Sequence, residues 1–365
     1  GYRIMLMRFH NTLKITHKIV LGSVLFCGLA LVLVILPTSN AGTFAQDPTS
    51  IPLSPEQLNL LSEIDAADLD QGNWQTYSAV SYNNLFYSES LQLAPDSTLS
   101  AQRATDTLYT TQFQGNPLNP IYSSNTLMTI ENRETSLFDI EQQLEDSYTL
   151  TVEARYIDGH LYVQALRDGG SETLVEMPPF GWHDVTDNPD QFEALQAANL
   201  SQFMPDPPSP LNPHPLFNTD FFALTRGSAL RDLVADIELV NPSETITEGP
   251  LAGLVVRQIR IQLNPLAMLE NAFASFENSD GLVAAFANEG VDMSLTVWLD
   301  ASTSRRVREQ FVLVVQGQPD PAVFGYPASE IGEDATLSII YQLESDISYT
   351  DINAPVDIQP PLLEQ

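Results

Sequence analysis

Cysteine and lysine are almost absent from this sequence. Among 365 residues there is a single cysteine, Cys27, which lies in an apolar run near the N-terminus, and no lysine follows Lys18. The long remainder of the chain therefore has no disulfide and no thiol chemistry. It also has no lysine with which a glycine-rich loop could bind phosphate.

Cations of any kind are scarce beyond residue 45. All 47 acidic residues lie from Asp47 onward. The only cations in this part of the chain are eleven arginines, so it carries a formal charge of −36. Such a charge repels nucleic acid and anionic membrane surfaces at long range, and we expect no nucleic-acid partner. The acids are scattered, which favours solubility as their role over an acidic functional patch.

Residues 19–37 form a charge-free apolar run that follows Arg8, Lys14 and Lys18. The run is long enough to cross a bilayer core of about 30 Å, and the cations before it place the N-terminus in the cytoplasm. Small residues at 39–45 favour cleavage by a signal peptidase, whereas the length of the run favours a retained anchor. Both alternatives stay open, and each predicts an extracytoplasmic protein, secreted or in the cell envelope.

The composition then divides the chain into four parts. We interpret residues 1–45 as a signal peptide or signal anchor, 46–54 as a linker, 55–360 as one domain and 361–365 as a tail. Six prolines at 204–215 exclude a helix or central strand there. They predict a proline-rich insertion within the domain, with a domain boundary as the alternative.

Hydrophobic periodicity within the domain predicts an α+β fold. Ser54 and Pro55 form a helix start, and further helices are expected at 189–203, 219–234 and 265–288. Asp158-Gly159 joins two alternating runs, as in a two-residue β-hairpin. Period-two alternation predicts strands at 74–93, 105–113, 126–138, 148–157, 160–166, 251–263, 291–300, 307–315 and 335–345. Antiparallel strands with one apolar face need a cover, which the helices can supply.

Several motifs resemble those of the LppX/LprG lipoproteins of the LolA-like superfamily. They are YIDGHLYVQ followed by Gly181-Trp182-His183, then VDMSLTVWLDASTSRRVREQFVLVV, then SDISYTDINAPVDIQPP. The marks of the resemblance are Trp298 and Asp300 at a strand end and the tail residues Ser345, Asp346, Asn353, Pro355, Val356, Ile358 and Pro360. It covers roughly residues 55–360. Two departures are that the lipid-anchored cysteine of that family is missing and that segment 167–235 is longer.

The resemblance implies a strongly curved antiparallel sheet, a half-open barrel, wrapped around helices. It also implies an extracytoplasmic, non-catalytic carrier for a lipid or other apolar ligand. No histidine has metal-ligand spacing, and we expect neither metal nor cofactor. The alternative is a membrane-tethered sensor or protein-interaction module on the same fold. The residues expected to line the ligand cavity are apolar and lie on the predicted strands and the 265–288 helix: Val255, Ile259, Leu269, Phe273, Phe276, Val283, Phe286, Met293, Leu295, Val297, Phe311, Leu313, Ile339 and Tyr341.

Other candidates have an ordinary structural explanation beside a functional one. His183-Asp184 is either a catalytic pair or a polar pair at a strand end. Arg305, Arg306 and Arg308 either contact an anionic headgroup or acidic partner, or form a solvated hairpin turn. The role of Trp298 stays open, and Phe217, Phe221 and Phe222 either line a cavity mouth or pack in the core.

Overall fold

A computed structural model describes most of the chain beyond residue 52. The described residues are 53–94, 97–115, 122–139, 142–169, 181–184, 227–264, 290–318, 320–321, 331–332 and 334–362. The N-terminal run 19–37, the predicted helices 189–203 and 265–288, and the proline-rich insertion 204–215 lie outside them. Among the described residues, no helix is long and apolar enough to cross a membrane.

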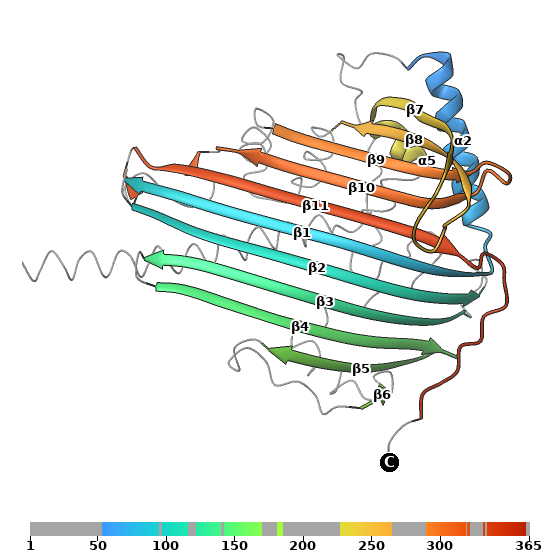
Figure 1. Cartoon of the computed structure of the whole chain (residues 1–365), viewed down its shortest axis with the longest axis horizontal. Coiled ribbons are helices and arrows are strands. Elements are labelled where there is room, and N and C mark those ends of the chain that lie inside the picture. The colour runs from blue at the N-terminus through green and yellow to red at the C-terminus, as the bar shows by residue number, and fades with distance from the viewer. Residues whose placement is uncertain are drawn as a thin grey trace, which may run out of the picture.

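The described residues form one antiparallel sheet of eleven strands (Figure 1). The order is β6-β5-β4-β3-β2-β1-β11-β10-β9-β8-β7, so the first and last strands pair at the centre. The strands are β1 (Thr76–Ala94), β2 (Ser97–Gly115), β3 (Tyr122–Asp139), β4 (Gln142–Ile157), β5 (His160–Gly169), β6 (His183–Asp184), β7 (Val234–Thr245), β8 (Val255–Leu263), β9 (Gly290–Asp300), β10 (Arg306–Gly317) and β11 (Thr336–Thr350).

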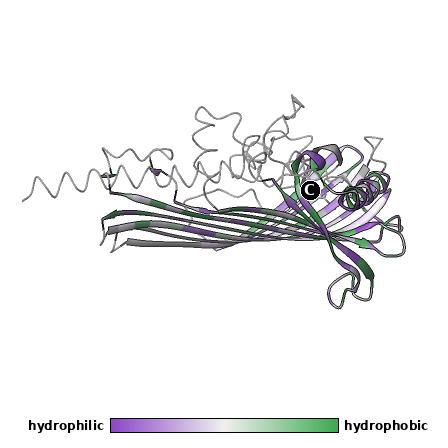
Figure 2. Ribbon diagram, turned by 90° about the horizontal axis from the view of Figure 1, so that it is seen from above, coloured by the Kyte–Doolittle hydropathy of each residue, from purple (hydrophilic) through white to green (hydrophobic). Residues whose placement is uncertain are grey.

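The predicted antiparallel sheet is confirmed, but its predicted shape is not. The sheet is open, with β6 and β7 at its two edges, and Figure 2 shows its long strands running nearly straight instead of curling into a half-barrel. The described fold is therefore mostly β. Strands of up to 19 residues are far longer than the usual 5–6 residues, and they span roughly 60 Å.

Helix α2 (Pro55–Gln71) lies on one side of the sheet at one end (Figure 2). Its predicted start is confirmed: Ser54 is the N-cap, and the side chains of Ser54 and Gln57 form a reciprocal capping box. Leu60, Leu61 and Ile64 are buried against the sheet. A second helix, α5 (Gly227–Leu233), contacts α2 and occupies the last part of the predicted 219–234 helix.

The two faces of the sheet differ. We call the face that shares its buried side chains with α2 the inner face, and the opposite one the outer face. On the outer face, the connection between β7 and β8 folds back over β8 to β10. There Trp298 packs in a small separate cluster with Ile246, Leu251, Val256 and Val307, which answers the question left open about this tryptophan.

The nine predicted strands are present, most with longer bounds but β8 shorter, and two strands, β6 and β7, were not predicted. The hairpin at Asp158-Gly159 is present, with positive φ at both residues and Ile157 paired with His160. Strand β7 was not predicted because Pro242 and three irregularities in its pairing with β8 disrupt its alternation. Beyond β11 a turn at 351–353 leads into segment 354–362, which runs past the ends of β1 to β4 (Figure 1). There Arg155 Nη1 donates to the carbonyl oxygen of Gln359 at 3.2 Å.

Candidate functional site

The inner face of β8 to β11 brings together the predicted ligand residues that the structure describes best. Leu295 lies opposite both Ile261 and Phe311, and Met293 lies opposite Leu313. Eight of the predicted residues belong to one buried cluster, each at most 6% exposed: Ile259, Met293, Leu295, Val297, Phe311, Leu313, Ile339 and Tyr341. Alternation along each strand places them on one face.

The remaining six predicted residues are not part of that cluster. Val255 is the first residue of β8, and it is 41% exposed. The pairing of β8 with β9 begins only at the next residue, Val256. The other five lie outside the described residues: Leu269, Phe273, Phe276, Val283 and Phe286.

A row of polar side chains crosses the inner face at the centre of the sheet. Asn83 on β1 lies opposite Ser345 on β11 and opposite Thr107 on β2. All three side chains are buried, with exposed fractions of 3 to 5%. Asn83 Oδ1 and Ser345 Oγ have no hydrogen-bond partner in the part of the chain that the structure describes.

The sequence prediction did not include this central row, which Asn83, Thr107 and Ser345 define. A signal for it was present, since Asn83 falls between Ala79 and Tyr87 at the positions of β1 that face the core. A polar residue at a position expected to be apolar is informative, because burying it without a partner costs about 1–3 kcal/mol. Next to this row, Tyr109 is fully buried, and burial raises the pKa of its hydroxyl well above the ordinary value.

A buried charge cluster joins α2 to the inner face. The guanidinium of Arg306 is fully buried, forms an ion pair with Asp68 of α2 and contacts Glu309 Oε2 at 2.6 Å. The hydroxyl of Tyr349 donates to the other oxygen of Glu309 at 2.8 Å. Arg306 is therefore neither a solvated turn residue nor exposed to a headgroup, and both sequence interpretations are wrong for it.

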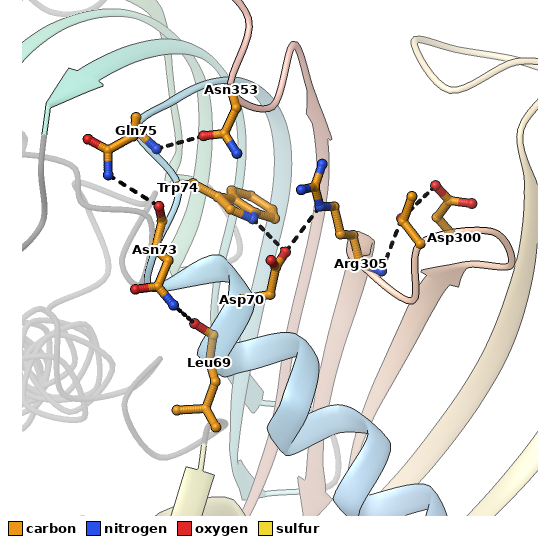
Figure 3. Close-up of polar contacts among 9 residues, drawn as sticks. Leu69, Asp70, Asn73, Trp74, Gln75, Asp300, Arg305 and Asn353 are labelled. Carbon is orange, nitrogen blue, oxygen red and sulfur yellow. Dashed lines mark hydrogen bonds and ion pairs between the residues drawn. The ribbon is translucent and has the colours of Figure 1, made fainter.

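The two other arginines of the β9–β10 hairpin, Arg305 and Arg308, also form ion pairs within the chain. Figure 3 shows Asp70 between the indole of Trp74 and the side chain of Arg305, and its Oδ2 atom lies 3.0 Å from Trp74 Nε1 and 3.2 Å from Arg305 Nε. Arg308 forms an ion pair with Asp346, and its guanidinium carbon lies 4.6 Å from the ring centroid of Trp298. The three arginines thus fasten α2 and β11 to the β9–β10 hairpin.

The histidine candidate is arranged differently from the prediction. His183 and Asp184 are consecutive in β6, so their side chains point to opposite faces. Asp184 Oδ2 instead lies 2.9 Å from Nδ1 of His160 on the neighbouring strand. The geometry therefore favours a polar pair, formed by Asp184 with His160 between β6 and β5.

A cavity of about 680 Å³ lies where β9 begins and β10 ends, at the end of these strands far from α2. Asp292, Val314, Gln316 and Ser338 line it from outer-face positions. None of its lining residues is among the predicted ligand residues, although Val291, which also lines it, packs against the buried cluster of the inner face.

The carboxyl group of Asp106, on the outer face, has a shifted pKa. Asp106 accepts hydrogen bonds from Tyr82 Oη and Asn84 Nδ2, each at 2.7 Å, and from Arg133 Nη2 at 2.9 Å. Partial burial alone would raise the pKa of this carboxyl group, but the three donors outweigh it and lower the pKa below the ordinary value.

Comparison with known proteins adds no relative. Neither the models of known protein families nor the curated proteins contain a match to this chain.

Proposed function

We propose that this protein is an extracytoplasmic, non-catalytic binding or carrier protein for a lipid or other apolar ligand. The observation that carries the proposal is the length of the apolar inner face. Its rows continue from Tyr77 to Leu91 along β1, whereas α2, at 17 residues, is only about 25 Å long. Helix α2, with the short α5 beside it, therefore spans only part of a long inner face whose buried positions are mostly apolar.

The ligand in this proposal lies against the inner face of β8 to β11 and the adjoining β1. The eight buried candidates supply one wall, and the predicted helix 265–288 supplies the other. Each methylene transferred from water to such a wall contributes about 0.8 kcal/mol. The resemblance to LppX/LprG lipoproteins supports the same function.

Two features of the sequence support the proposed extracytoplasmic location and the proposed class of ligand. The run 19–37 with its preceding cations supports export across a membrane. The charge of −36 after residue 45 disfavours nucleic acid and anionic surfaces as partners, and an uncharged or weakly polar ligand avoids that repulsion.

Native mass spectrometry of the full-length chain, purified without detergent from the cells that export it, tests the proposal. We expect a population heavier than the polypeptide, whose extra mass is released by organic solvent and identified as an apolar molecule. Detection of the bare polypeptide alone, in a preparation whose circular dichroism shows folded β-sheet, would contradict the proposal.

The length of the run 19–37 favours one alternative, a membrane-tethered sensor or interaction module. A charge-free run of this length exceeds the 7–15 residues usual for the apolar region of a cleaved signal. N-terminal sequencing of the protein recovered from cells separates the two. A mature chain that begins at Gly42 or Gln46 argues against the tether, and an intact N-terminus supports it.

A further inference from the structure

The central row of Asn83, Thr107 and Ser345 is the feature of the inner face that an apolar ligand does not explain. Its side chains occupy adjacent positions on β2, β1 and β11, directly opposite one another in the register. The next inner residue toward the far end of β1 is Leu85, opposite Leu343 of β11. Toward α2, β11 continues with Ile347 and Tyr349, both 1% exposed. On β11 the row therefore interrupts an apolar surface, while on β1 and β2 the neighbouring inner positions toward α2 include the buried polar residues Ser81 and Thr111.

Two polar atoms of this row lack a hydrogen-bond partner among the described residues. Asn83 Nδ2 donates to Ser81 Oγ at 3.4 Å, which is a long hydrogen bond, while Asn83 Oδ1 accepts none. Ser345 Oγ also lacks a partner there. Two such atoms, each on a residue 3% exposed, carry a desolvation cost of about 1–3 kcal/mol apiece that a partner would remove.

We propose that the central row binds the neutral polar group of an amphiphilic ligand whose apolar chains lie along the inner face on either side. This inference rests on the proposed function and specifies the class of ligand. Asn83 Oδ1 is an acceptor only, so it requires an O–H or N–H donor from the ligand. Ser345 Oγ can donate to a carbonyl or hydroxyl oxygen of the same group.

The chemistry of the row also disfavours a charged group on the ligand. An ionised group would have to lose its water at a site where no member of the row carries a charge, which is costly. The nearby acid Glu309 is already engaged with Arg306 and Tyr349. The preferred ligand thus carries a hydroxyl or a primary or secondary amide, and a pure hydrocarbon leaves both atoms unsatisfied.

Binding of two matched probes to the full-length chain tests this inference. Oleamide offers N–H donors and a carbonyl, and 1-octadecene has the same chain length without either. We expect the wild-type protein to bind oleamide more tightly than 1-octadecene. Asn83→Leu and Ser345→Ala should each weaken oleamide binding about tenfold, which corresponds to about 1.4 kcal/mol, and leave 1-octadecene binding unchanged.

Ser348→Ala is the matched control, because Ser348 lies on the same strand with its side chain on the outer face. It should change the binding of neither probe, and urea unfolding of all variants checks that each is folded. A protein that binds both probes equally, with no effect of either inner-face variant, would overturn the inference while the proposed function stands. Failure of the wild type to bind either probe would overturn both.

A crystal structure of the protein with oleamide supplies the second readout. The inference requires the amide within hydrogen-bond distance of Asn83 Oδ1 or Ser345 Oγ. If both atoms are bonded to buried water only, with the amide elsewhere, the row is a hydration site and the inference is wrong.

Discussion

The two halves of the sheet bury different kinds of side chain on the same face. In β8 to β10, inner positions carry large apolar residues almost without interruption, from Ile259 and Leu295 to Phe311 and Leu313. In β1 and β2 the buried inner positions alternate between apolar residues and Ser81, Asn83, Glu89, Thr107 and Thr111. The inner positions of the β8–β10 half are thus almost uniformly apolar, whereas those of the β1–β2 half include buried polar side chains beside apolar ones.

In the proposed function, this difference gives the two halves different tasks: apolar contact in β8 to β11 and polar contact in β1 and β2. The predicted ligand residues were chosen for apolarity, and those that the structure describes fall in β8 to β11, next to α2. The polar residues that give a ligand its specificity are expected elsewhere, at the junction of β1, β2 and β11. Four sets of variants test this difference between the two halves.

The largest effect is expected where α2 is tied to the apolar half. Arg306→Met should lower the free energy of unfolding by about 3–5 kcal/mol, because Asp68 and Glu309 are left buried without their cation. Urea unfolding measures this loss. Arg133→Met is the control, since Arg133 is 65% exposed in its ion pair and its loss should cost less than about 1 kcal/mol. Equal losses for both variants would contradict the role given to Arg306.

A pair of truncations compares the two halves directly. Leu295→Ala should destabilise the protein by about 2–5 kcal/mol through lost burial and a new cavity. Ser345→Ala, at an equally buried site, should cost less than about 1 kcal/mol or even stabilise the unliganded protein, because it removes an unsatisfied hydroxyl. The same urea series measures both, and a large loss for Ser345→Ala would show that the row serves packing.

A smaller effect is expected at the segment that joins β11 to the ends of the neighbouring strands. Asn353 has a φ of 58°, accepts from the backbone N–H of Gln75 at 2.8 Å and donates its own N–H to the carbonyl of Thr76. Asn353→Ala should cost about 2 kcal/mol, combining the lost hydrogen bond with the strain of positive φ. Asn353→Gly relieves the strain and should cost about half as much. A thermal melt of the two variants, read against wild type, checks the order.

The smallest effect concerns the outer face and pH. The pKa of Asp106 is lowered in the folded protein, so its contribution to stability is present above the unfolded-state pKa, about 3.9, and is lost as pH falls through the lower folded value. Asp106→Asn should therefore make stability fall less steeply with acid in that window. Unfolding midpoints at a series of pH values measure the slope, and an unchanged slope would show that the donors do not act on this carboxylate.

Local features of this fold were predictable from sequence, and long-range features were not. Ser54 and Pro55 marked the start of α2, and Asp158-Gly159 marked a hairpin, since both signals depend on neighbouring residues alone. The pairing of β1 with β11 joins residues 244 to 272 positions apart and has no local signal. The open shape of the sheet likewise depends on how all strands twist together.

The candidate site divides in the same way. Strand alternation correctly grouped Leu295, Phe311 and Tyr341 with the other apolar residues of the inner face. It did not reveal that Asn83, Thr107 and Ser345 meet, because their proximity depends on the register of three strands. The burial of Arg306 depends on Asp68, which lies 238 residues earlier in the chain.

Photolabelling with an oleoyl amide that carries a diazirine in its chain tests the central claim most directly. Alternation along β1 separates the faces residue by residue, with Tyr77, Asn83 and Tyr87 inside and Tyr82, 45% exposed, outside. The account predicts labels on inner residues of β1 and β11 that excess oleamide prevents. Labels confined to outer residues such as Tyr82 and Leu108, or labelling that oleamide does not reduce, would contradict it.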